Sequence, residues 1–144
     1  NILKNNFTVK HYGGDKERSI KPAVAITSQS DLLIYNNSGE PISLEITNDY
    51  TGLFVNRKIC NFRDFKFQSL KSNSLKQQTL ILGVDMINKE FFIIDVSKYN
   101  SIRKIDSHPP FGGKSAFELD LENIPFFEFT PSNLLKIFNL YINR

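Results

Sequence analysis

The amino-acid sequence predicts a mainly β domain of the α+β class that ends in a C-terminal helix. Several short segments alternate apolar and polar residues with the period of two that strands show, and the last segment changes to a helical period. At 144 residues the chain has the length of one domain with one hydrophobic core. We therefore expect residues 1–144 to form a single domain. A chain that begins at Asn1 is also compatible with a fragment of a longer protein.

The first part of the chain contains three segments that predict strands. Residues 24–28 and 32–35 are short apolar runs, and turn-forming residues follow the second run. In residues 42–47, isoleucine and leucine alternate with Ser43, Glu45 and Thr47. This alternation predicts one row of side chains in the core and one row in water.

The stretch RDFKFQSLK, residues 63–71, repeats the alternation. Phe65 and Phe67 would share one face of a strand, and Lys66 and Gln68 would share the other. We expect a strand here with a basic outer face in solvent.

Residues 79–99, TLILGVDMINKEFFIIDVSKY, give the strongest structural signal. Two apolar runs are joined around Asn88 and Lys89, which is typical of a hairpin. Within the second run, FFIID is apolar at four successive positions, so we expect that strand to be covered on both faces.

The C-terminal segment predicts an amphipathic helix. Thr130 followed by Pro131 fits an N-cap and a proline in the first turn. Apolar residues then recur at helical spacing, and we expect them to pack in the core rather than to bind a cofactor or a membrane. These residues are Leu134, Ile137, Phe138, Tyr141 and Ile142.

Composition and charge narrow the function classes. The net charge is +3, and basic residues concentrate between Gly52 and Lys104 while acidic residues collect near the C-terminus. This distribution predicts one face suited to phosphate or to an acidic partner, although the same lysines are also compatible with ordinary solvated surface. The single Cys60 excludes an internal disulfide framework and predicts a buried thiol in a reduced, cytoplasmic setting. No apolar stretch approaches the roughly 18 residues of a membrane span, so we expect a soluble protein.

The sequence GGKS, residues 112–115, resembles the end of a phosphate-binding loop. Such a loop requires an earlier glycine at position 108, which is His108 here, and a helix after the loop. Residues 117–121 instead alternate as a strand does. We therefore expect no nucleotide site and no cofactor.

Two further arrangements of residues resemble catalytic or metal sites only in part. Asp85 and Asp95 lie on consecutive predicted strands, as the carboxylates of metal-dependent nucleases do, but Lys98 follows Asp95 by three positions. On a strand this spacing places the two side chains on opposite faces, where they cannot act on one water molecule. His11, His108 and Cys60 have no zinc-site spacing. We expect no metal and no catalytic residue.

One family resemblance covers the middle of the chain. The order is Gly83 and Asp85 on a strand, Asp95 with Lys98 after its partner, Ser115 on a return, the alternating residues 117–121 and a helix start at 122–124. This order resembles the DNA-recognition (effector) domain of bacterial restriction endonucleases. The resemblance implies a DNA-binding pseudobarrel, an open β-barrel shared with plant B-three-type domains, that grips the major groove of double-stranded DNA between two arms.

The charge pattern and the resemblance together predict which residues contact DNA. Basic side chains would neutralise phosphates, short polar side chains would position the backbone, and Arg103 would be able to read guanine. The predicted contact residues are Arg57, Lys58, Arg63, Lys66, Lys98, Asn100, Ser101, Arg103, Lys104, His108, Lys114 and Ser115.

The resulting hypothesis is a sequence-specific DNA-binding module of a restriction–modification system. It would lack catalysis of its own and would deliver a nuclease or motor partner to a site. Two alternatives remain open: a protein-interaction domain, of the immunity or adaptor kind, whose basic third binds an acidic partner, and a metal-dependent nuclease domain.

Overall fold

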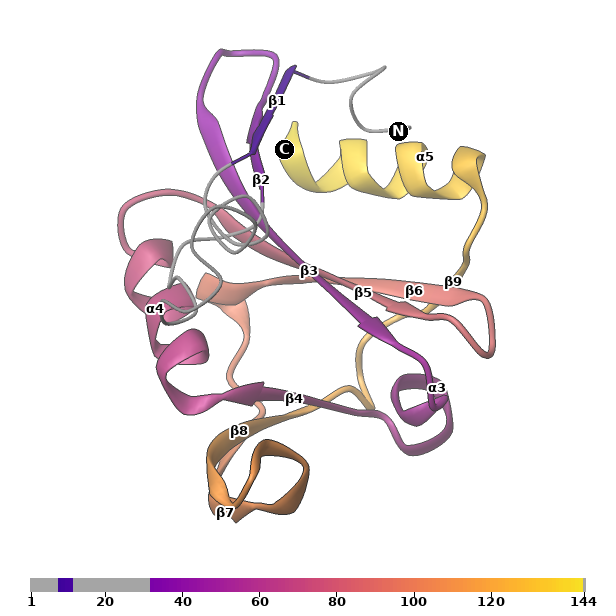
Figure 1. Cartoon of the computed structure of the whole chain (residues 1–144). Helices are drawn as coiled ribbons and strands as arrows, with labels where there is room; N and C mark the ends of the chain where they lie inside the picture. The colour runs from indigo at the N-terminus through magenta and orange to yellow at the C-terminus, as the bar shows by residue number, and fades with distance from the viewer. Residues whose placement is uncertain (1–7, 12–31, 144) are drawn as a thin grey trace.

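The computed structural model describes residues 8–11 and 32–143 and arranges them in two β-sheets with helices (Figure 1). The strand predicted at residues 24–28 lies outside the described residues. The α+β class and the C-terminal helix are confirmed. The elements of the larger sheet are β1 (Thr8–His11), β2 (Leu32–Tyr35), β3 (Pro41–Asp49), β5 (Thr79–Asp85), β6 (Glu90–Asp95) and β9 (Phe127–Glu128).

The six strands of the larger sheet lie in the order β1-β2-β3-β5-β6-β9. Neighbouring strands are antiparallel except β3 and β5, which are parallel. A parallel pair needs a crossover connection, and here the crossover contains α3 (Leu53–Arg57), β4 (Ile59–Arg63) and α4 (Asp64–Ser74). The crossover therefore places α4 on one face of the large sheet.

The second sheet has three antiparallel strands in the order β4-β8-β7, with β7 at Ile102–His108 and β8 at Lys114–Asp120. A 3₁₀ turn, η1 (Val96–Lys98), leads from β6 towards this sheet, and a second, η2 (Pro109–Phe111), lies at the tip of the β7–β8 hairpin. The segment after GGKS is thus a strand, as predicted.

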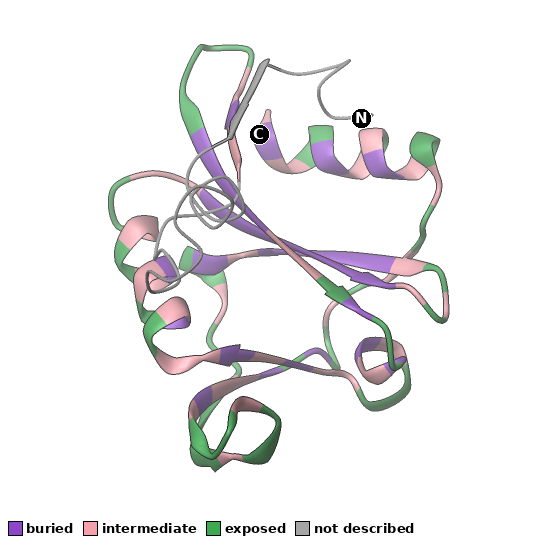
Figure 2. Cartoon of the chain, in the orientation of Figure 1, coloured by how far each residue is buried: buried purple, intermediate pink, exposed green. Residues whose placement is uncertain are grey.

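Two apolar clusters lie on opposite faces of the large sheet. Leu80, Leu82 and Phe91 pack with the C-terminal helix α5 (Pro131–Ile142). Ile81 and Phe92 pack on the other side, with residues of α4 and the second sheet. Buried residues therefore run continuously along β5 and β6 (Figure 2). The predicted hairpin and the coverage of residues 91–94 on both faces are confirmed.

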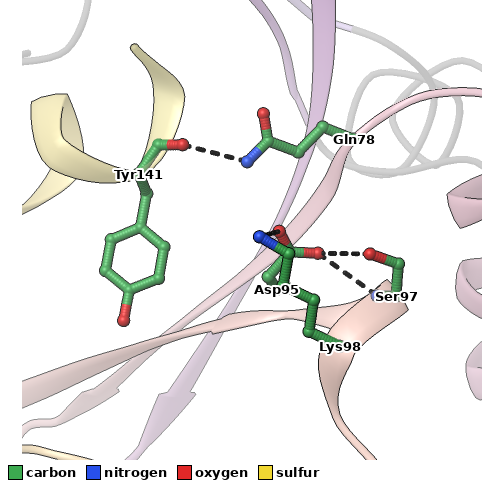
Figure 3. Close-up of polar contacts among 5 residues, drawn as sticks. All are labelled: Gln78, Asp95, Ser97, Lys98 and Tyr141. Atoms are coloured by element: carbon green, nitrogen blue, oxygen red, sulfur yellow. Dashed lines mark hydrogen bonds and ion pairs between the residues drawn. The ribbon is translucent and has the colours of Figure 1, made fainter. Parts of the chain in front are cut away.

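The termini of α5 are fixed by side-chain contacts. Thr130 Oγ1 accepts a hydrogen bond from the backbone N–H of Asn133 at 3.1 Å, and Pro131 occupies the first turn, which confirms the predicted cap. Near the other end, Gln78 Nε2 donates to the carbonyl oxygen of Tyr141 at 3.0 Å (Figure 3). No helix among residues 32–143 is long and apolar enough to cross a membrane.

The strand predicted at residues 63–71 is wrong, because this segment forms α4 from Asp64 onwards. Phe67 and Leu70 are buried three positions apart, as one face of a helix requires, whereas Phe65 is 45% exposed. The helix covers the face of β3 that was expected in water. Ser43 and Glu45 are consequently buried.

The DNA-binding pseudobarrel is also wrong. It would join the strands in one open β-barrel, whereas the hairpin β5–β6 belongs to the six-stranded sheet and the hairpin β7–β8 to the separate three-stranded sheet. Residues 122–124, expected to start a helix, form a turn in which Ile124 N–H donates to the carbonyl oxygen of Leu121 at 3.0 Å.

Candidate active site

A buried ion pair joins the central strand β3 to helix α4. Lys66 Nζ lies 3.1 Å from Glu45 Oε1, and the two side chains are only 12% and 10% exposed. A carboxylate and an ammonium in such a place have lost most of their water, so each depends on the other, and removal of one leaves a charge that is costly to bury.

Polar contacts fix α4 against β3 and thereby position Lys66. Asn73 Nδ2 donates to Ser43 Oγ at 2.7 Å and to Thr79 Oγ1 at 3.2 Å. Lys71 Nζ donates to the carbonyl oxygens of Val96 and Tyr99 at 3.4 and 3.3 Å. The sequence therefore places one lysine of α4 on backbone carbonyls and the other on the carboxylate of Glu45.

A groove of about 640 Å³ lies beside the start of α4. It combines three charged side chains with an exposed aromatic ring and two neutral polar side chains. Its lining residues are Arg63, Asp64, Phe65, Gln68, Lys114 and Ser115. Because Phe65 and Lys66 are consecutive on α4, the groove is adjacent in the sequence to the ion pair.

Asp64 connects this groove to the β7–β8 hairpin. Its Oδ2 accepts a hydrogen bond from Ser115 Oγ at 2.8 Å and lies 3.5 Å from Lys104 Nζ, and its Oδ1 accepts from Gln68 Nε2. The hydrogen bonds from Gln68 and Ser115, together with the charge of Lys104, hold the pKa of Asp64 below its ordinary value. Asp64 is therefore ionised at neutral pH, with the Lys104 ammonium beside it.

Several residues predicted to contact DNA are engaged within the protein. Arg103 Nη2 donates to Glu118 Oε1 at 2.7 Å across the β7–β8 pair. Lys58 Nζ lies 4.0 Å from the centroid of the Phe126 ring. These contacts reduce the number of cations available to a ligand.

The other predicted contact residues are distributed over the surface of the second sheet and its surroundings. The Arg63 guanidinium lies 5.7 Å from the Phe111 ring centroid, and the His108 ring lies 4.7 Å from it. Arg57, Asn100, Ser101 and Lys114 are exposed. The structure thus brings Arg63, Lys104, Lys114 and Ser115 together around Asp64, but not Arg57, Asn100 or Ser101.

Asp95 and Lys98 do meet, contrary to the prediction of opposite faces. Because η1 replaces a strand after Asp95, Lys98 Nζ lies 3.9 Å from Asp95 Oδ2 (Figure 3). The carboxylate also accepts hydrogen bonds from the backbone N–H and the hydroxyl of Ser97, at 3.2 and 2.9 Å. Asp95 is therefore the cap of η1.

Asp85 is fully buried and has a structural role. It accepts hydrogen bonds from the backbone N–H groups of Val55, Ile87 and Asn88 at 3.0, 3.0 and 2.8 Å, and from Asn88 Nδ2 at 3.0 Å. Burial is the largest single effect and raises the pKa, but these hydrogen bonds together hold the pKa of Asp85 below its ordinary value. Asp85 therefore stabilises the turn between β5 and β6 and holds it against α3.

The sequence does not reveal the Glu45–Lys66 pair, because the local alternation of apolar and polar residues places both side chains on water-facing rows of strands. A signal was present: Phe67 and Leu70 are spaced as one face of a helix, and a helix over residues 64–74 would have covered the row that includes Glu45. The pairing of Glu45 with Lys66 depends on the crossover between β3 and β5, which no local sequence pattern predicts.

No family model matches this chain, and no curated protein matches its sequence. Among solved structures it is similar to Hjc, a Holliday junction resolvase from the archaeal hyperthermophile Archaeoglobus fulgidus. The two chains are 10% identical, the similarity covers 83% of this chain and 78% of the resolvase chain, and the TM-score is 0.47. A likeness of this degree transfers no activity to this chain.

The two separate sheets correct the identification made from the sequence, because that identification implied one open β-barrel. The resemblance to the DNA-recognition domain of restriction endonucleases is therefore wrong. The DNA-binding module without catalysis and the restriction–modification assignment, which were inferred from that resemblance, are withdrawn with it.

Proposed function

We propose that this chain is a metal-dependent nuclease domain acting on DNA, with Glu45 and Lys66 in its active site. The observation that carries the proposal is the buried ion pair between them. Metal-dependent nucleases combine carboxylates on a strand with a lysine near the reacting phosphate. Thr47, two positions after Glu45 on the same strand, cannot supply such an ammonium. Lys66 on α4 supplies it instead.

The residues present suit a hard divalent cation with few protein ligands. Mg²⁺ usually keeps several waters and binds one or two carboxylates together with substrate phosphates. Glu45 would be such a carboxylate. Residues 32–143 contain no group of three or more histidine, cysteine or acidic residues that could hold a metal ion. A bound cation would polarise the phosphate and lower the pKa of a water molecule.

The chain's own residues would stabilise the transition state of phosphodiester cleavage and attract the DNA. Lys66 would donate hydrogen bonds to an anionic oxygen and compensate the charge that develops in the transition state. Lys114 and Arg63, beside the start of α4, would attract the phosphate backbone of DNA. Placement on a strand and a packed helix, rather than on loops, keeps the pair rigid.

A cleavage assay with matched variants tests this proposal. The purified chain is incubated with Mg²⁺ or Mn²⁺ and with single-stranded, duplex and branched DNA, alongside Glu45→Gln and Lys66→Met. We expect Glu45→Gln to abolish cleavage and Lys66→Met to slow it by about 100-fold or more, as loss of a donor to a developing anion does. Lys136→Met, at an exposed position on α5, should cleave at the wild-type rate.

Two results would overturn the proposal. One is the absence of metal-dependent cleavage of every DNA by the wild-type chain. The other is cleavage by Glu45→Gln at the wild-type rate. That result would mean that Glu45 takes no part in cleavage or that the activity comes from a contaminating nuclease. Circular dichroism spectra of both active-site variants establish that a loss of cleavage is not a loss of folding.

A further inference from the structure

The groove beside α4 places an exposed aromatic ring among cations. Phe65 is 45% exposed, whereas Phe67, two residues further along the same helix, is 3% exposed. An exposed phenylalanine alone is ordinary. Phe65, however, lines a groove of about 640 Å³ together with Arg63 and Lys114.

The charges of the groove favour an anionic ligand. Lys114 is exposed, and the part of the chain that the structure describes contains no carboxylate within ion-pair distance of it. The Arg63 guanidinium lies over the Phe111 ring at 5.7 Å, a contact that leaves its N–H groups able to donate. The negative charge of Asp64 is balanced by Lys104 at 3.5 Å and by the hydroxyl of Ser115. A phosphate near Lys114 would therefore meet a net positive groove.

We propose that this groove binds one unpaired nucleotide of a DNA strand, with its base stacked on Phe65 and its flanking phosphates on Lys114 and Arg63. The proposal rests on the nuclease function and names its substrate class, which is DNA with a single-stranded segment. Aromatic platforms beside cationic side chains hold unpaired bases without sequence preference. In a continuous duplex both faces of each base are covered by neighbouring pairs, so Phe65 would have no face to contact.

The groove lies next to the Glu45–Lys66 pair along α4 but is distinct from it. Phe65 and Lys66 are consecutive on the helix, and their side chains leave it about 100° apart, which is one residue of an α-helical turn. The ring of Phe65 lines the groove, whereas Lys66 points to Glu45. The unpaired nucleotide would thus hold the DNA strand beside the helix turn that carries Lys66.

The sequence contains no tryptophan, which permits a direct test of stacking. Phe65→Trp introduces one indole on the proposed platform, and a stacked base quenches indole fluorescence. In EDTA, to prevent cleavage, we expect a single-stranded oligonucleotide to quench this tryptophan and a blunt-ended duplex not to. Leu75→Trp is the matched control, because Leu75 is 88% exposed just after the same helix but does not line the groove, and its fluorescence should not change.

A second variant measures the contribution to binding. Phe65→Ala should weaken single-strand binding about 5- to 150-fold by fluorescence anisotropy in EDTA, the range found for removal of one stacking platform, and should leave duplex binding unchanged. Equal quenching of both tryptophans, or equal single-strand affinity of Phe65→Ala and wild type, would overturn the proposal. Those results would leave metal-dependent cleavage and its loss in Glu45→Gln untouched, so the two proposals fail separately.

Discussion

Two buried carboxylates, Asp85 and Glu45, differ in what surrounds them. Asp85 accepts hydrogen bonds from three backbone N–H groups and one side-chain amide, which commit it to the fold. Glu45 faces the ammonium of Lys66 at 3.1 Å, on the same face of β3 as Ser43. The sequence shows both residues only as acidic, yet their roles differ. Asp85 stabilises the fold, and Glu45 has a proposed chemical role.

The role of Asp85 predicts a pH-dependent loss of stability in Asp85→Asn. The amide presents N–H groups to N–H donors, so we expect a loss of about 1–3 kcal/mol in the free energy of unfolding at neutral pH. Because the folded pKa of Asp85 lies below the ordinary 3.8, its stabilisation is fully present above that value and is lost as the pH falls through the folded pKa. The free energies of unfolding of the wild type and of Asp85→Asn, measured by urea denaturation, should therefore converge in strong acid. A constant difference across this range would contradict the assignment.

Gly83 supplies a second prediction at the residue scale. A Cβ at this position would lie 2.2 Å from Cε2 and Cζ of Phe92, whose ring is fully buried. Gly83→Ala should therefore lower the free energy of unfolding by about 1–3 kcal/mol, the usual cost of overpacking a core. The smaller side chain of Phe92→Leu should reduce that cost in the double variant. Additive losses in the two single variants would show that this contact is not the cause.

Helix α4 is the element whose local sequence is ambiguous. Its residues 65–68 alternate apolar and polar side chains, so a strand and a helix are both compatible with that short stretch, and only Leu70 separates them. The hairpin β5–β6 and helix α5 were predictable because their patterns are longer and carry turn or capping residues. Local sequence therefore identifies an element well when more than one signal agrees.

The cap of α5 gives a prediction for an element. Thr130→Ala removes the hydroxyl that accepts the N–H of Asn133, so the free energy of unfolding should fall by about 1 kcal/mol. Thr130→Ser keeps the hydroxyl and should cost only a small fraction of that. Denaturant unfolding monitored by circular dichroism measures both. An equal loss in the two variants would mean that the methyl group, rather than the cap, stabilises the helix start.

At the scale of the whole molecule, the crossover from β3 to β5 creates the candidate site. It returns the chain parallel to β3 and places α4 over Glu45, with the second sheet and its hairpin beside the start of that helix. The sequence indicated the basic residues and most of the strands, but it could not indicate which charges pair across the fold. Lys66, Lys104 and Arg103 each have a carboxylate partner at least fifteen positions away.

Metal binding tests most directly whether Glu45 belongs to a divalent metal site. Mn²⁺ is titrated into the wild-type chain and into Glu45→Gln, and the signal of free Mn²⁺ is followed by electron paramagnetic resonance. Glu122→Gln, at an exposed position after β8, is the matched control. We predict that the wild type and the control deplete free Mn²⁺ equally and that Glu45→Gln does not. Equal depletion by all three chains, or by none, would show that Glu45 is not a ligand of a divalent cation.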